Sequence, residues 1–137
     1  HPRQGVLNWF LRELLDGKKV KLFGTGEQIR DINYVDDVVE AFLLAAASEK
    51  AWGEVFNLGG IAIGLKEFVE EAINIYGKGK YEVVTFPDDR KKIEIGDYIA
   101  DYFKIYRLLG WQPKTSLKKG LKATFEYFKS HKKHYWE

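Results

Sequence analysis

The spacing of apolar residues along the chain predicts five helices. Apolar side chains recur every three or four residues, as one face of an amphipathic helix requires. The clearest stripe begins at Leu65 and ends at Tyr76, just before Gly77. The five predicted helices are Val6–Leu15, Asp37–Ala47, Leu65–Tyr76, Tyr102–Leu109 and Leu117–Phe128, and Asp36, Asp101 and Ser116 are placed to cap the second, fourth and fifth.

Short runs rich in β-branched and aromatic residues lie between these helices and predict strands. The runs are Val20–Phe23, Ile29–Val35, Val55–Leu58, Tyr81–Phe86 and Ile93–Tyr98. The chain has no repeats and no linker long enough to divide it. Because strands and helices alternate imperfectly, we predict one α/β domain over residues 1–137, with about five helices around a small mixed sheet.

Composition narrows the range of partners. The chain has 137 residues, 45% of them hydrophobic, and a net charge of only +2. This balance gives no argument for nucleic acid or a membrane, and we expect neither as a partner. The longest apolar run, Ala41–Ala47, is far shorter than the ~20 residues that span a bilayer. No signal peptide is visible, so we expect a cytoplasmic protein. Since the first residue is not Met, we also expect a piece of a longer chain.

Metal and thiol chemistry find little support in the sequence. The chain has no cysteine, which excludes disulfides, Cys-ligated zinc and a thiol nucleophile. His131 and His134 have helix-face spacing without an obvious third ligand, so we expect no metal site. The aromatic and basic stretch Tyr127–Trp136 is interpreted as a solvated helix end, because lysines there suit the helix dipole.

Two patterns of dinucleotide-dependent enzymes are missing or incomplete. A dinucleotide fold uses Gly-x-Gly-x-x-Gly, and neither Gly24-Thr25-Gly26 nor Gly77-Lys78-Gly79 has the third glycine. Tyr76 and Lys80 match Tyr-x-x-x-Lys, whose chemistry requires both residues on one intact helix. Two glycines between them, each costing ~1 kcal/mol, predict that the helix has already ended. We therefore interpret Tyr76 as a core residue and expect no catalytic residue in this chain.

Two cationic clusters suggest a site for a phosphate-bearing ligand. Gly24 and Gly26 form a turn that would let a ligand approach the backbone, and Arg30 follows on the next strand. A guanidinium offers five donors in a planar fork that suits phosphate oxygens, and Asp31 would orient that fork or pair with another cation. The second cluster is Arg90-Lys91-Lys92. Together they would clamp a diphosphate, although surface cations often bind nothing.

Three ordered stretches, residues 22–38, 53–60 and 108–121, resemble the extended short-chain dehydrogenase/reductase family. These are the NAD-dependent nucleotide-sugar epimerases and dehydratases. The resemblance covers nearly the whole chain and implies the C-terminal, substrate-binding half. The Rossmann-type half, which carries the glycine fingerprint, the catalytic tyrosine and NAD, is missing from this sequence. The resemblance implies that NAD belongs to the full-length enzyme and that this chain alone binds none.

The resemblance also implies substrate-binding roles for particular residues. Arg30 resembles the arginine that contacts the substrate diphosphate, and Arg90 or Lys91 takes the place of a second one. Glu94 takes the place of an acid that binds ribose hydroxyls. Phe23, with the backbone of Lys21, resembles the strand lining the base pocket, and Gly5-Val6 resembles the segment running past the nucleotide.

Other residues of the resembling stretches have structural interpretations. We predict that Asp36 and Asp37 cap a helix rather than contact ligand, and that Asn57 and Gly59-Gly60 form a strand-end turn. Trp111 and Pro113 are expected to anchor the loop between the last two helices.

The resemblance is compatible with three alternative functions. In the first, the chain holds the base and diphosphate of a UDP- or dTDP-sugar for an NAD-dependent 4-epimerase, whose missing half oxidises carbon 4 and returns the hydride. In the second, the enzyme is a 4,6-dehydratase that eliminates water from carbons 5 and 6. In the third, the chain is a non-catalytic module that senses nucleotide sugars or pairs with a separate Rossmann chain. Ile32 stands where relatives often carry an aromatic residue, which leaves the base open.

Overall fold

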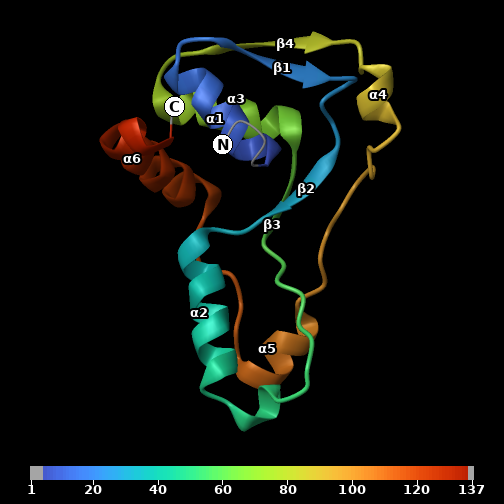
Figure 1. Cartoon of the computed structure of the whole chain (residues 1–137), viewed down its shortest axis with the longest axis vertical. Helices are drawn as coiled ribbons and strands as arrows, with labels where there is room; N and C mark the ends of the chain where they lie inside the picture. The colour runs from blue at the N-terminus through green and yellow to red at the C-terminus, as the bar shows by residue number, and fades with distance from the viewer. Residues whose placement is uncertain (1–4, 136–137) are drawn as a thin grey trace. The chain divides into compact units, whose positions relative to one another are not determined.

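The computed structural model describes residues 5–135, which form six α-helices, one short 3-10 helix and four strands (Figure 1). In chain order the elements are α1 (Val6–Leu15), β1 (Lys19–Phe23), β2 (Ile29–Ile32), α2 (Val35–Ala46), η1 (Glu49–Ala51), β3 (Ile61–Gly64), α3 (Leu65–Tyr76), β4 (Lys80–Val84), α4 (Asp88–Lys91), α5 (Phe103–Leu109) and α6 (Leu117–Tyr135). They divide into two compact units. Unit 1 takes the chain up to Gln28, then Gly64–Ile95 and the chain from Lys118 onward, and unit 2 takes Ile29–Ile63 and Gly96–Leu117.

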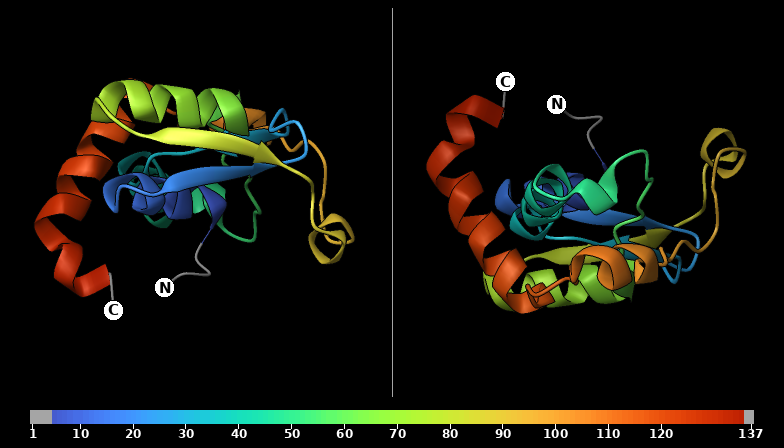
Figure 2. Two further views of the ribbon diagram at one scale, coloured as in Figure 1. Left: turned by 90° about the horizontal axis from the view of Figure 1, so that it is seen from above. Right: turned by 90° about the horizontal axis from the view of Figure 1, so that it is seen from below.

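Unit 1 is built on a parallel pair of strands. β1 and β4 run in the same direction, with Lys19 opposite Lys80 and Phe23 opposite Val84 (Figure 2). Helices α1 and α3 lie on one face of this pair (Figure 1). Alternation along β1 sends Val20 and Leu22 into the core, where both are fully buried. The helices contribute Phe10, Leu11, Leu14, Phe68, Val69 and Ala72, and α6 adds Leu121 and Phe125.

Unit 2 has its own small core. β2 pairs with β3, and Ala41 of α2, Ile105 of α5 and Trp111 form a buried cluster. Leu44, Phe56, Leu58, Tyr102 and Leu109 pack against this cluster. The indole of Trp111 is 1% exposed and donates its N–H to the carbonyl of Asp37 at 2.8 Å. The expected role of Trp111 as an anchor of the loop after α5 is therefore confirmed.

The α/β class is confirmed, but the predicted single mixed sheet is wrong in its arrangement. The strands form two separate two-stranded sheets. The helices at Val6–Leu15 and Leu65–Tyr76 begin and end where the sequence predicts. The last helix continues beyond Phe128 to Tyr135 with a kink at His131. The short α4 makes a sixth helix in the described chain, and the sequence prediction missed it.

Two predicted strands, Val55–Leu58 and Ile93–Tyr98, are not strands, and the few bonds that they make to other segments do not form a ladder. The carbonyl of Leu58 accepts the side-chain amide of Asn33. The backbone N–H of Ile29 donates to the carboxylate of Asp97 at 2.8 Å, and Tyr98 makes one backbone bond to Ile29. The pairing that β2 needs comes instead from β3, which the sequence prediction missed.

Close backbone approach explains the glycines that precede β3. A Cβ at Gly60 would lie 2.1 Å from the carbonyl oxygen of Ile32, and one at Gly59 would lie 2.6 Å from that of Ala100. The N–H of Gly60 donates to the carboxylate of Asp31. This turn therefore leads into β3 rather than out of a strand at Val55–Leu58. None of the helices formed by residues 5–135 has both the length and the apolar character to cross a bilayer.

Candidate functional site

The candidate site in unit 1 is the edge where β1 and β4 both end. Because the two strands are parallel, their carboxyl ends meet at one edge, which is where ligands bind in open α/β sheets. Phe23 is the last residue of β1, and Phe86 follows the end of β4 by two residues. Their ring centroids lie 5.6 Å apart at an angle of 53°. This edge therefore presents two half-buried aromatic rings.

A glycine turn fixes the geometry of this edge. The N–H of Gly24 donates to the carbonyl of Val84 at 3.0 Å, which continues the strand pairing by one residue. Gly24 has φ +67°, and a Cβ there would lie 3.3 Å from the ring of Phe86. The side-chain amide of Gln28 donates to the carbonyl of Phe23 at 3.3 Å. The missing side chain of Gly24 thus leaves space for the ring of Phe86, which also belongs to unit 1.

Gly26 has a packing role as well. Its φ is +74°, and a Cβ there would lie 3.2 Å from Leu22 and 3.3 Å from Lys66. The carbonyl of Gly26 accepts the N–H of Lys66 at 2.8 Å, and that of Gln28 accepts the N–H of Leu65 at 3.1 Å. These bonds satisfy the first donors of α3, which would otherwise lack partners. The second half of the turn is therefore bonded to the start of α3, and the predicted approach of a ligand to this turn stays a prediction.

The cluster Arg90-Lys91 lies on α4, which begins four residues after β4 ends. The N–H groups of Arg90 and Lys91 donate to the carbonyl of Pro87 at 3.0 and 2.8 Å. The guanidinium of Arg90 is 64% exposed and lies 3.8 Å from the carboxylate of Asp89. Because that ion pair is exposed, it holds the guanidinium weakly. Arg90 therefore lies exposed on the segment that leaves the candidate edge.

Arg30 lies on β2 in unit 2, and its guanidinium has partners. One terminal nitrogen donates to the carbonyls of Ile29, at 2.9 Å, and Gly96. The predicted orienting role of Asp31 is wrong, because its carboxylate accepts the N–H groups of Gly60 and Ala100, the latter at 2.8 Å. Asp31 ties two loops of unit 2 together.

Seven of the eight predicted substrate-binding residues belong to unit 1, and Arg30 alone belongs to unit 2. Gly5 has φ +63° and precedes α1, and Val6 is 42% exposed. Lys21 is exposed on β1 opposite Glu82. The seven in unit 1 are Gly5, Val6, Lys21, Phe23, Arg90, Lys91 and Glu94. The clamp that pairs Arg30 with Arg90 stays a prediction.

The expected capping role of Asp36 and Asp37 is wrong. Helix α2 begins at Val35, so both carboxylates lie in its first turn, and no side chain caps its start. Asp37 is 4% exposed and accepts the N–H groups of Lys114 at 3.2 Å and Thr115 at 2.9 Å. It also accepts the hydroxyl of Thr115 at 3.1 Å. Asp37 therefore fastens the loop before α6 to α2, a structural role.

The structural interpretation of Tyr76 is supported. Helix α3 ends at this residue, and Gly77 follows in the left-handed conformation. The ring of Tyr76 stacks on Phe125 with centroids 5.0 Å apart, and the Lys129 ammonium lies 4.9 Å above it. Tyr76 and Lys80 thus lie on different elements, and the catalytic geometry of Tyr-x-x-x-Lys is not formed.

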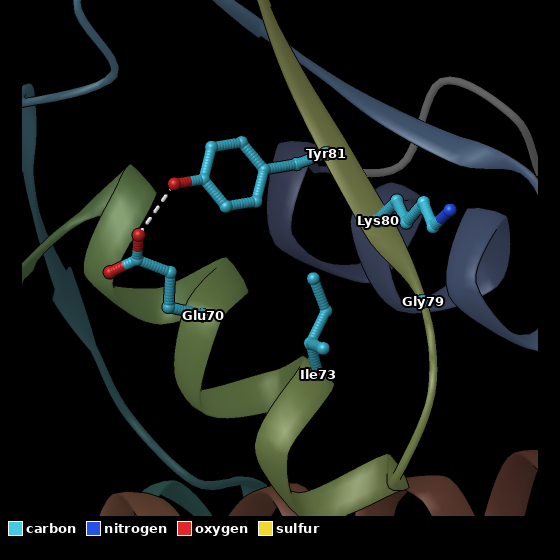
Figure 3. Close-up of a pocket in the computed structure, with 5 residues that line it drawn as sticks. All are labelled: Glu70, Ile73, Gly79, Lys80 and Tyr81. Carbon is cyan, nitrogen blue, oxygen red and sulfur yellow. Dashed lines mark hydrogen bonds between the residues drawn. The ribbon is translucent and has the colours of Figure 1, made fainter.

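One pocket of unit 1, of about 380 Å³, has none of the eight predicted residues in its lining (Figure 3). It is lined by Glu70, Ile73, Gly79, Lys80 and Tyr81. The hydroxyl of Tyr81 donates to the Glu70 carboxylate at 2.5 Å. That hydrogen bond, with burial and the charge of Glu70 as further causes, raises the pKa of Tyr81.

The histidine pair on α6 has local partners. The imidazole of His131 stacks on Tyr127 with centroids 4.3 Å apart, and its Nδ1 lies 2.9 Å from the carbonyl of Tyr127. His131 and His134 have ring centroids 6.3 Å apart. Within residues 5–135, no group of three or more His, Asp or Glu side chains is arranged to hold a metal. Trp136, at the end of the aromatic and basic stretch, lies outside the described residues.

The sequence of this chain is similar to part of several enzymes named for sugar nucleotides. Residues 1–59 match the NAD dependent epimerase/dehydratase family. The chain is similar to the UDP-glucuronate 4-epimerase of Thermodesulfobacterium geofontis, with 34% identity over 88% of this chain and 36% of that protein.

Solved structures agree with the sequence match. The UDP-glucose 4-epimerase of Thermotoga maritima, solved with UDP-glucose, has a TM-score of 0.78 and 36% identity over 95% of this chain and 41% of that one. The dTDP-glucose 4,6-dehydratase DesIV of Streptomyces venezuelae, solved with NAD, has a TM-score of 0.84 and 26% identity over 99% of this chain and 41% of that one. The chain spans about two fifths of the length of these proteins. The match is therefore to part of each enzyme, and the chain is a portion of a protein of the NAD-dependent epimerase/dehydratase family.

Proposed function

We propose that this chain is the substrate-binding portion of an NAD-dependent nucleotide-sugar 4-epimerase that acts on a UDP- or dTDP-sugar. The observation that carries the proposal is the edge of unit 1 where two parallel strands end: Phe23 is the last residue of β1, and Phe86 and α4 follow β4. Relatives named for UDP- and dTDP-sugars support the choice of ligand class.

In the proposal, the base, the diphosphate and the ribose of the ligand each have a side chain of matching chemistry. The rings of Phe23 and Phe86 offer apolar surface for a pyrimidine base, since aromatic side chains and bases stack favourably. Arg90 and Lys91 provide charge for the diphosphate, and the fork of Arg90 suits phosphate oxygens. Glu94 accepts hydrogen bonds from ribose hydroxyls, because a carboxylate has several acceptor sites. Binding energy from these remote groups fixes the position of the sugar without taking part in its chemistry.

In this proposal another part of the enzyme binds NAD, and two features of this chain support that division. The glycine turn at Gly24–Gly26 lacks the third glycine of a dinucleotide fingerprint. The first N–H groups of α3 are already bonded to the carbonyls of Gly26 and Gln28, whereas a pyrophosphate site needs such donors free. We therefore assign NAD binding and hydride transfer to the part of the enzyme that this chain does not contain.

A 4,6-dehydratase is the second candidate, because the similar solved structures include a dTDP-glucose 4,6-dehydratase. Product analysis of a family protein that contains this chain separates the two. A 6-deoxy-4-keto sugar identifies a dehydratase, and a C4-inverted sugar identifies an epimerase. A non-catalytic binding module forms neither product.

Titration of the chain with UDP, dTDP and their sugars, followed by calorimetry or NMR, tests the binding role. Replacing Phe23 or Arg90 with alanine should weaken binding about tenfold each, which corresponds to ~1.4 kcal/mol. Lys118→Ala is the matched control, since Lys118 is an exposed cation on α6 and belongs neither to the two strands nor to α4. Folded protein that binds none of these ligands at millimolar concentration, or equal loss in the control, contradicts the proposed site.

A further inference from the structure

Residues 96–98 are fastened to β2 by side chains as well as by the backbone. The N–H of Ile29 donates to the carboxylate of Asp97 at 2.8 Å, and the N–H of Tyr98 donates to the carbonyl of Ile29 at 3.1 Å. The guanidinium of Arg30 donates to the carbonyl of Gly96. All five residues belong to unit 2. Asp97 therefore supplies the acceptor for the first N–H of β2, which begins at Ile29.

The Asp97 contact is local and open to water. Its N–H···O distance of 2.8 Å is typical of a hydrogen bond to a carboxylate, and Asp97 is exposed. Gly96 precedes it with φ +71°, and a Cβ there would have nothing within 4 Å. The chain thus bends at Gly96 without close packing. Because water competes for an exposed carboxylate, we expect the contact to act on its own segment more than on the stability of the whole chain.

The segment just before this attachment carries three of the proposed ligand groups. Arg90 and Lys91 lie on α4, and Glu94 follows soon after α4 ends. The N–H of Glu94 donates to the carbonyl of Lys91 at 3.4 Å, which fixes the local turn. From Glu94 to Gly96 the chain can span at most ~7 Å. The place at which residues 96–98 attach to β2 therefore limits where Glu94 and the end of α4 can lie.

We propose that Asp97 is a positioning residue for the nucleotide-sugar site, because it fixes the end of the segment that carries Arg90, Lys91 and Glu94. The inference rests on the proposed function, which assigns those three groups to the diphosphate and the ribose. Asp97 contacts no ligand in this proposal, since a carboxylate repels a diphosphate. Removing its charge would by itself tighten the binding of UDP, whereas losing its positioning role weakens that binding. The sign of the change in affinity separates the two effects.

Titration of variants with UDP, followed by calorimetry, tests the positioning role. Asp97→Ala should bind UDP about fivefold more weakly than wild type, as the loss of one partly solvated hydrogen bond implies. Asp97→Asn keeps an oxygen that can accept the Ile29 N–H, so its affinity should stay within about twofold of wild type. Asp36→Ala removes another exposed carboxylate of unit 2 and is the matched control, with an affinity also within about twofold of wild type.

Combined substitutions separate positioning from a general loss of structure. In a chain with Arg90→Ala and Glu94→Ala, adding Asp97→Ala should change the affinity for UDP by less than about twofold, because the groups that it positions are gone. In a chain with Phe23→Ala, adding Asp97→Ala should still weaken binding about fivefold, because Phe23 belongs to β1. NMR titration measures these weaker affinities.

Limited trypsin digestion reports on the segment without any ligand. Cleavage after residues 90–92 should be about fivefold faster in Asp97→Ala than in wild type, because cleavage follows local opening of the segment. Cleavage after Lys118, on α6, should proceed at the same rate in both proteins.

Tighter or unchanged binding of UDP by Asp97→Ala would overturn the positioning role, and so would an Asp97→Asn variant that binds as weakly as Asp97→Ala. A loss that persists undiminished without Arg90 and Glu94, or unchanged cleavage after residues 90–92, would overturn it as well. A folded wild-type chain that binds no UDP refutes the proposed function, and this inference with it. A wild-type chain that binds UDP, beside an Asp97→Ala variant that binds it equally well, refutes only the positioning role.

Discussion

Replacing Asp37 should destabilise unit 2 far more than replacing its neighbour Asp36. The Asp37 carboxylate is 4% exposed and receives three hydrogen bonds, from the N–H groups of Lys114 and Thr115 and from the Thr115 hydroxyl. Losing one partner of a hydrogen bond to a charged group typically costs about 1.5–3 kcal/mol. Because Lys114 is exposed and Thr115 half-buried, water replaces part of what Asp37→Ala removes. We expect a loss of about 3 kcal/mol rather than the full sum.

The isosteric variant sharpens the test. In Asp37→Asn the amide oxygen can still accept both backbone N–H groups, and the amide nitrogen can donate to the Thr115 hydroxyl oxygen. Only the contribution of the charge is lost, so we expect Asp37→Asn to lower the free energy of unfolding by about 1 kcal/mol. Asp36→Ala removes an exposed carboxylate from the first turn of α2 and should cost about 0.5 kcal/mol.

Urea denaturation followed by tryptophan fluorescence gives the three free energies, since Trp111 is buried in unit 2. Hydrogen exchange gives a local readout of the same contacts. The amides of Lys114 and Thr115 should exchange roughly a hundredfold faster in Asp37→Ala, as ~3 kcal/mol implies. An Asp37→Ala variant no less stable than Asp36→Ala would refute the reasoning. So would an Asp37→Asn variant as unstable as Asp37→Ala.

Two further predictions concern unit 2 and unit 1 separately. Gly60→Ala should cost at least about 3 kcal/mol in thermal unfolding, because its Cβ would lie 2.1 Å from the Ile32 carbonyl oxygen. Gly53→Ala, at φ +71° with nothing within 4 Å of the new Cβ, should cost only about 1 kcal/mol; similar losses in both would show that the close approach is absent. The raised pKa of Tyr81 means that its hydrogen bond to Glu70 adds stability below the ordinary pKa near 10, and that this contribution disappears as pH rises through the higher folded-state value. Between neutral pH and pH ~10, wild type and Tyr81→Phe should therefore differ by a constant amount in their free energy of unfolding, and the two should converge above that range. A difference that grows at alkaline pH would contradict the assignment.

The elements that could be predicted from the sequence are those whose signals lie within a few residues along the chain. Helices at Val6–Leu15 and Leu65–Tyr76 follow from a 3.6-residue apolar period and a glycine after each last turn, both of which are local signals. The end of α3 at Tyr76 also follows from the glycines after it. The same local signals predict that Tyr76 and Lys80 do not share a helix, as a catalytic Tyr-x-x-x-Lys requires.

Long-range pairing decided the rest. A strand exists only if another segment pairs with it, so Val55–Leu58 and Ile93–Tyr98 have strand composition without being strands. The sequence singled out Phe23 and Arg90, but the parallel register of β1 with β4 is what puts Phe86 beside Phe23. An aromatic residue at the end of a second strand-like run was the available signal for Phe86. Asp37 has the sequence position of a helix-start residue, yet its partners come from a loop more than 70 residues later. The sequence alone determined where five of the six described α-helices lie, because an amphipathic helix depends on neighbours a few positions away. Which residues share a strand edge, a core or a buried hydrogen bond depends on distant segments meeting, and only the tertiary structure decided that.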